Sequence, residues 1–256
     1  MALPERHASR RARIAHAYNT LNEQGYFTDR IGGNDAYLGS LMAHYVPRDA
    51  SSILEVGAAT GLWMRRVLHK RPALREVTVV EISDAAEECR RRLAPLLDRR
   101  PGARLDVVQD DFLEAAARLR PAQVVASSFV ADYMGNPSDY LRRLHDLAEP
   151  GGRVIAVEVL TSSRAPVGSV SPGMLAGSFL RLCLAHAKVR KLPPVRGVVR
   201  SMGLYRLPEE PAFKDLQRYT ADYTFPRGLW RAQARKYPGA VFHDLGIVGM
   251  LVLPKL

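Results

Sequence analysis

Residues 52–61 have the sequence SILEVGAATG, a short apolar run that ends in a loop of small residues. The run includes two β-branched residues, and apolar positions at helical spacing follow it between 62 and 68, so it predicts a strand that leads directly into a helix. Small residues at such a join let the backbone turn tightly and approach a ligand, and the first N–H groups of the helix face the same side. The stretch therefore predicts a strand–loop–helix unit with a small-molecule site at its turn.

The alternation of strand and helix continues as far as residue 160. Short apolar runs rich in β-branched residues predict further strands, and helical periods lie between them. The predicted elements are strands at 52–56, 77–81, 105–108, 123–127 and 153–158 and helices at 84–97 and 140–147, with a stop signal at 149–152. This pattern predicts an α/β fold in which helices cover a doubly wound parallel sheet.

The chain on either side of this alternation has a different character. Residues 5–46 have helical periods, with breaks at Gln24-Gly25 and Gly32-Gly33. After residue 160 the alternation stops for about eighty residues, which is too long for an ordinary loop and predicts a helical insertion. Residues 240–246 and 247–253 predict two strands that close the sheet antiparallel. The predicted domains are an N-terminal helical lid (1–47), a core (48–160 with 240–256) and a helical, basic substrate cap (161–239).

The composition is that of a globular protein with a strongly basic balance. The chain has 256 residues, with 37 Lys and Arg against 26 Asp and Glu and a formal net charge of +11. Fourteen of the basic side chains but only four of the acidic ones lie between residues 160 and 240, so the predicted cap carries most of the imbalance. This charge favours an acidic acceptor or an acidic carrier, although an arginine excess is also common in proteins from high-GC genomes.

Cysteine usage and hydropathy predict the location. Cys89 and Cys183 are the two cysteines and have no CxxC or Cys/His spacing, so we expect neither a disulfide framework nor a structural zinc site, and a cytoplasmic location. The amino terminus lacks the apolar stretch of a secretory signal, and the longest apolar run, 174–184, is interrupted by Arg181 and too short to span a bilayer. No metal-ligand constellation stands out, so we expect no metal.

The chemistry of the loop narrows the ligand. The order is Gly-x-x-x-Gly at Gly57 and Gly61, unlike the G-x-G-x-x-G of a dinucleotide site or the Gly-Lys-Ser/Thr of a P-loop. Glu55 stands where a carboxylate repels a pyrophosphate and tolerates a cation. Glu81, at the end of the second predicted strand, is placed to accept hydrogen bonds from both hydroxyls of a ribose. The predicted ligand is a nucleoside with a positive, phosphate-free tail.

Together these features resemble the class I S-adenosylmethionine-dependent methyltransferases, from about residue 51 to 160 and again at 240–253. The resemblance implies a Rossmann-like, seven-stranded sheet of order 3-2-1-4-5-7-6. It also implies S-adenosylmethionine as the cofactor and S-adenosylhomocysteine as the product. A nicotinamide-dependent enzyme is the main competitor, and Ala59 departs from the family's usual middle glycine. The implied cofactor-binding residues are Tyr18, Glu55, Gly57, Ala58, Ala59, Gly61, Glu81, Ile82, Asp110, Asp111, Phe112, Ser127 and Ser128.

The resemblance assigns roles to two further segments. Residues 109–112 are similar to the family's adenine-binding turn, in which Asp111 would face the exocyclic amine and Phe112 would flank the ring. Ser127-Ser128 would line the mouth between the methyl donor and the substrate. A purely structural role stays open for the acids, above all for Asp110 as the cap of the helix that follows.

Candidate catalytic residues follow the fourth and fifth predicted strands. They are Asp132, Tyr133 and Glu158, with a role in loop structure as the alternative. Methyl transfer from a sulfonium is an in-line displacement, so a base is required only where the nucleophile is protonated. The Asn/Asp-Pro-Pro-Tyr/Phe signature of enzymes that methylate planar amino nitrogens is absent. Tyr18 lies in a region that folds over the cofactor in many small-molecule members.

The leading hypothesis is a methyltransferase for a small organic molecule of specialised, natural-product or lipid metabolism, acting on O, N or C. The acceptor is expected to be acidic or carrier-bound, and a homodimer is a further expectation. Two alternatives stay open. One is an RNA or protein methyltransferase, which the interleaving of basic and apolar residues in the cap disfavours. The other is a cyclase-like protein that binds S-adenosylmethionine without transferring methyl.

Overall fold

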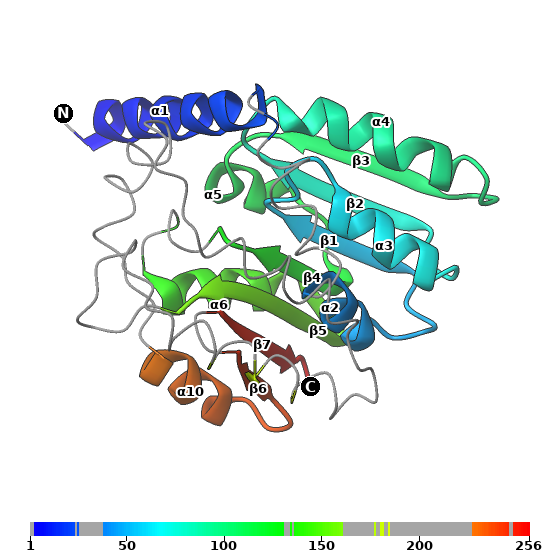
Figure 1. Cartoon of the computed structure of the whole chain (residues 1–256), viewed down its shortest axis with the longest axis vertical. Helices are drawn as coiled ribbons and strands as arrows, with labels where there is room; N and C mark the ends of the chain where they lie inside the picture. The colour runs from blue at the N-terminus through cyan, green and yellow to red at the C-terminus, as the bar shows by residue number, and fades with distance from the viewer. Residues whose placement is uncertain are drawn as a thin grey trace.

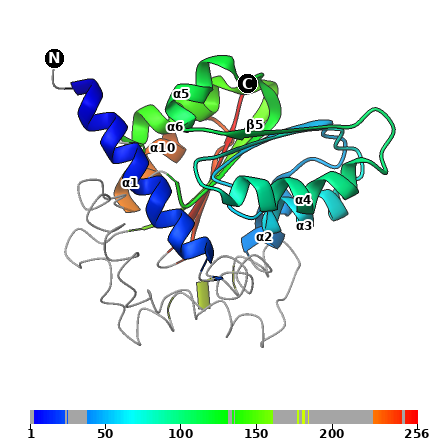
Figure 2. The same ribbon diagram turned by 90° about the horizontal axis from the view of Figure 1, so that it is seen from above.

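A seven-stranded sheet with helices on both faces organises the computed structural model of the chain (Figures 1 and 2). The structure describes residues 3–23, 25, 38–130, 134, 136–160, 177, 180, 181, 184, 227–245 and 248–256. The strands are β1 (Ser52–Val56), β2 (Glu76–Glu81), β3 (Arg104–Gln109), β4 (Ala122–Ser128), β5 (Ala148–Val159), β6 (Val241–Asp244) and β7 (Val248–Pro254). The helices are α1 (Leu3–Glu23), α2 (Leu38–Tyr45), α3 (Leu62–Lys70), α4 (Ala85–Leu97), α5 (Phe112–Ala115), the 3₁₀ turn η2 (Ala116–Arg118), α6 (Pro137–Asp146) and α10 (Arg227–Lys236).

The strand order is β3-β2-β1-β4-β5-β7-β6, which confirms the predicted order and fold class. The first five strands are parallel, and β7 pairs antiparallel with both β5 and β6. Parallel strands need crossover connections, and helices between them cover both faces of the sheet. All five residues of β1 are consequently buried. The carboxyl ends of β1–β4 meet at one edge, where ligands bind in open α/β sheets.

Two hydrophobic clusters lie on opposite faces of the sheet. Helices α2, α3 and α4 cover one face, and α5, α6 and α10 lie on the other (Figure 2). In α3 the buried positions are Trp63, Met64, Val67 and Leu68, a stripe that matches the helical repeat. Because helices cover both faces of the sheet, the side chains on both sides of each strand are buried. This explains why the strand sequences are nearly continuous apolar runs.

Two predicted starts differ from the structure by three residues or more. Helix α6 begins at Pro137 rather than at 140, because Asn136 accepts a hydrogen bond from the N–H of Ser138 at 2.9 Å and caps it. Strand β5 begins at Ala148, five residues before the predicted 153. The predicted stop at 149–152 is an irregularity inside that strand, since the register with β4 shifts there and Gly151 has a φ of 76°.

The two flanking regions are described in part. Helix α1 ends at Glu23, next to the predicted break at Gln24-Gly25. Of the predicted cap, 161–239, the described part is mainly α10, which packs on β6 and β7; most of the predicted helix 174–189 lies outside the described residues. The division into lid, core and cap stays a prediction. None of the helices in the described ranges is long and apolar enough to cross a membrane.

Candidate functional site

The loop between β1 and α3 turns through three residues with positive φ. Gly57, Ala59 and Gly61 have φ values of 75°, 45° and 74°. The N–H of Gly57 donates to the carbonyl of Val80 in β2 at 2.8 Å, which ties the loop to the next strand. The loop therefore lies at the carboxyl edge of the sheet, as predicted from SILEVGAATG.

Packing as well as φ demands glycine at two of these positions. A Cβ on Gly57 would stand 2.0 Å from Cγ2 of Val130, and a Cβ on Gly61 would stand 2.7 Å from Sγ of Cys89. Ala59, the departure from the usual glycine, adopts the left-handed conformation that costs a non-glycine residue about 1–2 kcal/mol. Its N–H donates to Oε2 of Glu81 at 2.8 Å, a bond that helps to hold this conformation.

Glu81, the predicted ribose ligand, is buried at the carboxyl end of β2, with 5% of its surface exposed. In addition to Ala59, its carboxylate accepts bonds on Oε1 from the N–H and the hydroxyl of Ser83, at 3.0 and 2.7 Å. Burial raises the pKa of Glu81, and these hydrogen bonds oppose the shift. The structure thus brings Glu81 to the loop as predicted, and adds Ser83, which the sequence reasoning did not single out.

The turn after β3 has a different internal arrangement from the one expected. Asp111, not Asp110, caps α5, because its Oδ1 accepts the N–H of Leu113 at 2.8 Å. The side chain of Phe112 is 2% exposed and packs edge-on against Tyr140 in the core. The structure thus places the Phe112 ring in the core, and the expectation that it flanks an adenine stays a prediction.

Asp110 connects this turn to α1. Its carboxylate pairs with the guanidinium groups of Arg11 in α1 and Arg118 in η2. Partial burial by itself would raise the pKa of Asp110, but the bonds from Arg118 and the N–H of Asp111 and the two positive charges outweigh it, so the pKa lies below its usual 3.8. Asp110 is therefore a charged anchor for α1.

A second anchor lies about two helical turns further along α1, at Asn19. Asn19 donates from Nδ2 to Oδ2 of Asp84 at 2.8 Å and accepts the N–H of Asp84 on Oδ1, also at 2.8 Å. Asp84 directly precedes α4, but its carboxylate forms no capping bond there. Helix α1 thus crosses the carboxyl ends of β2 and β3 (Figure 2), and Tyr18, next to Asn19, is half-buried.

The two serines at the end of β4 differ in burial. Ser127 is 0% exposed, and its hydroxyl and that of Tyr140 lie 2.6 Å apart in a hydrogen bond. Ser128 is half-buried, and its hydroxyl lies 3.7 Å from Sδ of Met42 in α2. Of the predicted pair, Ser128 is the one placed nearer the surface. Tyr140 has a pKa well above its usual value, since burial and the nearby charge of Glu158 both disfavour the phenolate.

Two buried carboxylates flank this region. Glu55, in β1, is 1% exposed, and Glu158, near the end of β5, is 0% exposed. Oε1 of Glu158 accepts the backbone N–H of Val130 at 3.0 Å, immediately after Phe129, whose φ is 57°. In the structure Glu158 holds the segment after β4, and its role as a catalytic acid stays a prediction. Asp132 and Tyr133 lie outside the described residues.

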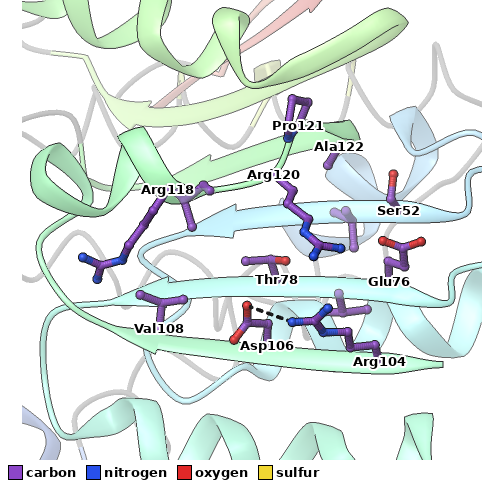
Figure 3. A pocket seen from close by; sticks show the side chains of 13 residues that line it. Ser52, Glu76, Thr78, Arg104, Asp106, Val108, Arg118, Arg120, Pro121 and Ala122 are labelled. Atoms are coloured by element: carbon purple, nitrogen blue, oxygen red, sulfur yellow. Dashed lines mark ion pairs between the residues drawn. The ribbon is translucent and has the colours of Figure 1, made fainter.

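A cavity of about 290 Å³ lies elsewhere on the molecule, over the face of β1, β2 and β3 (Figure 3). Thr78, Arg104, Asp106 and Arg120 are among its lining residues, and Arg104 pairs with Asp106 at 3.9 Å. The cavity exists because α5 and η2, with 4 and 3 residues, are too short to cover this face. It does not include the glycine loop or Glu81, so we do not assign the predicted chemistry to it.

Sequence comparison provides a family match. The methyltransferase domain family matches residues 13–200 of the chain. This range includes the second half of α1, the glycine loop, Glu81 and all of the parallel strands. No curated protein matches the sequence.

Solved structures share the fold at low identity. The mitomycin 7-O-methyltransferase MmcR is 18% identical over 87% of this chain and 54% of its own, with a TM-score of 0.52. An O-methyltransferase family protein from Burkholderia thailandensis is 13% identical over 90% of this chain and 58% of its own, with a TM-score of 0.52. The plantazolicin methyltransferase BamL, in complex with a triazolic desmethylPZN analogue and SAH, is 12% identical over 96% and 97%, with a TM-score of 0.51. The chain therefore spans little more than half the length of the first two.

Proposed function

The chain belongs to the methyltransferase domain family, and from that premise we propose that it transfers a methyl group from S-adenosylmethionine to a small organic acceptor. The observation that carries the proposal is the contact between Glu81 and the N–H of Ala59, 2.8 Å long, which joins the end of β2 to the glycine loop. A buried carboxylate beside a glycine-rich turn fits a nucleoside with a positive tail and disfavours a pyrophosphate.

The acids at this edge of the sheet fit the proposed cofactor. Glu55, Glu81 and Asp111 belong to β1, β2 and the turn after β3, so their carboxyl groups come from neighbouring strands at the carboxyl edge. Negative charge there favours a sulfonium, and the loop offers backbone groups to the amino-acid part. We propose that the other cofactor-binding residues named in the sequence analysis also contact the cofactor, Phe112 through its backbone.

Each part of the site has a separate task. When bound, the cofactor supplies an electrophilic methyl group on a sulfonium and leaves as S-adenosylhomocysteine. Glu81 orients the ribose: its bond from the rotatable hydroxyl of Ser83, 2.7 Å long, is the contact that a ribose hydroxyl can replace. Helix α1 covers the edge through Asn19 and Arg11 and excludes water from it, which favours an in-line displacement.

The acceptor is proposed to be a small natural-product-like molecule. Two of the similar solved structures carry the names of mitomycin and plantazolicin methyltransferases, and this chain shares their fold. We keep Asp132 and Tyr133 as candidate catalytic residues beside the acceptor. A cytoplasmic location, a homodimer, and the division into lid, core and cap also remain parts of this proposal.

Calorimetric titration with S-adenosylhomocysteine tests the cofactor site. Glu81→Gln removes the charge while keeping the size of the side chain, and we expect it to weaken binding at least tenfold. Glu76→Gln is the matched control, since Glu76 is an exposed glutamate at the other end of the same strand, and its affinity should stay within twofold. Equal affinities for the two variants, both folded by circular dichroism, would refute the assignment.

Transfer itself is tested with methyl-labelled S-adenosylmethionine and an extract from the source organism. We expect label in the small-molecule fraction. Label in RNA or in protein would overturn the choice of acceptor, and cofactor binding with no label in any fraction would favour the non-transferring alternative.

A further inference from the structure

The cavity over β1, β2 and β3 is lined by polar side chains that the sheet presents on one face (Figure 3). They include Glu76 and Thr78 of β2 and Arg104 and Asp106 of β3. Alternate residues of a strand point to the same face, so these four side chains share a face of the sheet. The register places Glu76 beside Arg104 and Thr78 beside Asp106, in two polar rows. We call this the sheet-face cavity.

The polarity of this face changes along the strands. Val80 follows Thr78 on the same face and is 1% exposed, whereas Thr78 is only partly buried. A strand face that a helix covers is normally apolar, as it is at Val80. The amino halves of β2 and β3 are instead polar where the short α5 and η2 do not cover them. The sequence itself therefore specifies an open, polar face.

Most of the charged residues in the lining are neutralised. Arg104 lies 3.9 Å from Asp106, which balances its charge. Arg118 belongs to a second balanced group, most of it outside the cavity, in which two arginines pair with two carboxylates: Arg11, Arg118, Asp110 and Glu114. Neither group leaves a net charge in the cavity.

Arg120 and Glu76 are the two charged lining residues that remain. Among the residues that the structure describes, neither side chain forms a hydrogen bond or an ion pair. Figure 3 shows the Arg120 side chain extending from the turn before β4 across β1 toward β2, where Thr78 and Glu76 lie. The two groups are too far apart to pair with each other, so the cavity contains one unneutralised cation and one unneutralised anion.

We propose that the sheet-face cavity binds a small zwitterion of the α-amino acid class, with its carboxylate on Arg120 and its ammonium group on Glu76. A guanidinium donates two parallel hydrogen bonds to a carboxylate, and an ammonium group donates to a carboxylate oxygen. Val108 and Leu119, also in the lining, favour an apolar side chain on the ligand.

The size and position of the cavity fit such a ligand. Its volume of about 290 Å³ lies at the lower limit of ligand pockets, about 300–1,000 Å³, and suits a molecule as small as an amino acid. The lining includes neither the glycine loop nor Glu81. The proposal therefore adds a second site and does not depend on the proposed function.

The competing explanation is an ordinary solvated face on which Arg120 and Glu76 are hydrated. Exposed charges contribute little to stability, about 0–1 kcal/mol for a pair, so stability alone does not distinguish the two explanations. A hydrated face predicts the same unsaturable response to a zwitterion, an anion and a cation. A binding site predicts that removing either charge from the ligand weakens binding.

L-Leucine is the probe. The melting temperature is measured against its concentration in protein saturated with S-adenosylhomocysteine, so that the amino-acid part of the proposed cofactor site is already filled. A ligand of the native state raises the melting temperature in a saturable way. Isocaproate, which lacks the ammonium group, and L-leucinamide, which lacks the carboxylate, are titrated in parallel at constant ionic strength.

Two arginine variants test the carboxylate contact. Arg120→Gln removes the cation from the cavity. Arg91→Gln is the control, since it makes the same change of charge at an exposed position of α4, on the other face of the sheet. General effects of an added amino acid on stability act on both variants and on the wild type alike, and cancel in the comparison.

We expect saturable stabilisation by leucine in the wild type and in Arg91→Gln, with an apparent Kd at least fivefold weaker in Arg120→Gln. Both analogues should bind the wild type at least fivefold more weakly than leucine does. No saturable response of the wild type, or equal responses of the two variants, would overturn the proposal. A dimer in analytical ultracentrifugation that Arg120→Gln dissociates would also overturn it, because a second copy would then cover the face.

Glu76→Gln tests the ammonium contact. It should abolish the preference for leucine over isocaproate, and a preference that persists in this variant would refute the assignment. Its affinity for S-adenosylhomocysteine should not change, because Glu76 lines this cavity and not the cofactor site. A wild type that does not bind S-adenosylhomocysteine would count against the proposed function, and the leucine titration without it would then test the cavity alone.

Discussion

Oε1 of Glu158 accepts the backbone N–H of Val130 at 3.0 Å, and both residues are buried. Cγ2 of Val130 occupies the space beside Gly57, so close that a Cβ on the glycine would stand 2.0 Å from it. The acid in β5 therefore holds the segment after β4 against the glycine loop of β1. Three strands are connected at the point where the cofactor and the acceptor are proposed to meet.

Removing the Glu158 carboxylate, which accepts the N–H of Val130, should lower both the stability and the turnover of the protein. Glu158→Ala leaves the buried N–H of Val130 without this partner, and we expect a loss of about 1–3 kcal/mol in the free energy of unfolding. Glu158→Gln keeps an acceptor oxygen and should lose less than half as much. Urea unfolding and kcat check this; a fall in kcat that is as large in Glu158→Gln as in Glu158→Ala would point to the charge and a direct chemical role.

Gly57→Ala should destabilise the protein by more than its backbone conformation explains. The new Cβ overlaps Val130, and such overpacking costs about 1–3 kcal/mol in addition to the left-handed φ. Gly102→Ala is the control, because Gly102 has a φ of 70° but no atom within 4 Å of an added Cβ. Thermal unfolding measures the loss of stability in both variants. Equal losses would show that Val130 can move aside at no cost in free energy.

The buried carboxyl of Glu81 predicts a pH dependence of stability. Its pKa in the folded state is raised above the ordinary 4.5, so the group is protonated in both states at lower pH and its contribution is then fully present. As pH rises through the folded pKa, the native state must ionise a desolvated group and the contribution is lost. The free energy of unfolding of the wild type, relative to Glu81→Gln, should therefore fall from about pH 4.5 upward. A difference that grows with pH in urea titrations would contradict this.

The hydrogen bonds between Asn19 and Asp84 should control the docking of α1. Asn19→Ala removes both, and we expect faster amide hydrogen exchange in α1 with unchanged exchange in β1 and β4. Thr20→Ala is the control, because the Thr20 hydroxyl donates to the carbonyl of His16 within α1 at 3.1 Å. We also expect faster release of S-adenosylhomocysteine from Asn19→Ala in stopped-flow measurements. Identical exchange in the two variants would show that other contacts hold the helix.

The parallel core was predictable because its signals are local. The strand at 52–56 matched its predicted bounds, and the strand at 77–81 was one residue short at its start. Where the prediction missed, a local signal was partly available: Asn136-Pro137 is a cap followed by a first-turn proline, which marks the start of α6. The irregular start of β5 depends on its pairing with β4. The sequence shows the break at 149–152 but not that it lies inside the strand.

The surroundings of some predicted site residues follow from the order of neighbouring strands. Those of others depend on how distant elements pack together. Glu81 and Ala59 come together because each ends or follows a neighbouring strand, and that juxtaposition follows from the topology. Phe112 and Ser127 turn inward to Tyr140, a contact that depends on how α6 packs on the sheet. Nothing in the residues around Phe112 distinguishes a ring that faces a ligand from one that faces the core.

The sequence by itself determined the alternation of strands and helices, the glycine loop with its acidic partner, and the concentration of positive charge in the predicted cap. These properties follow from periodicity, short-range turn chemistry and composition, each of which acts over a few residues. Only the tertiary structure decided that Glu158 holds the backbone of Val130, 28 residues away, and that three arginines meet at Asp244. Such contacts depend on the pairing of distant strands and on the packing of helices against them, because a side chain's partner is set by the fold and not by its neighbours in the chain.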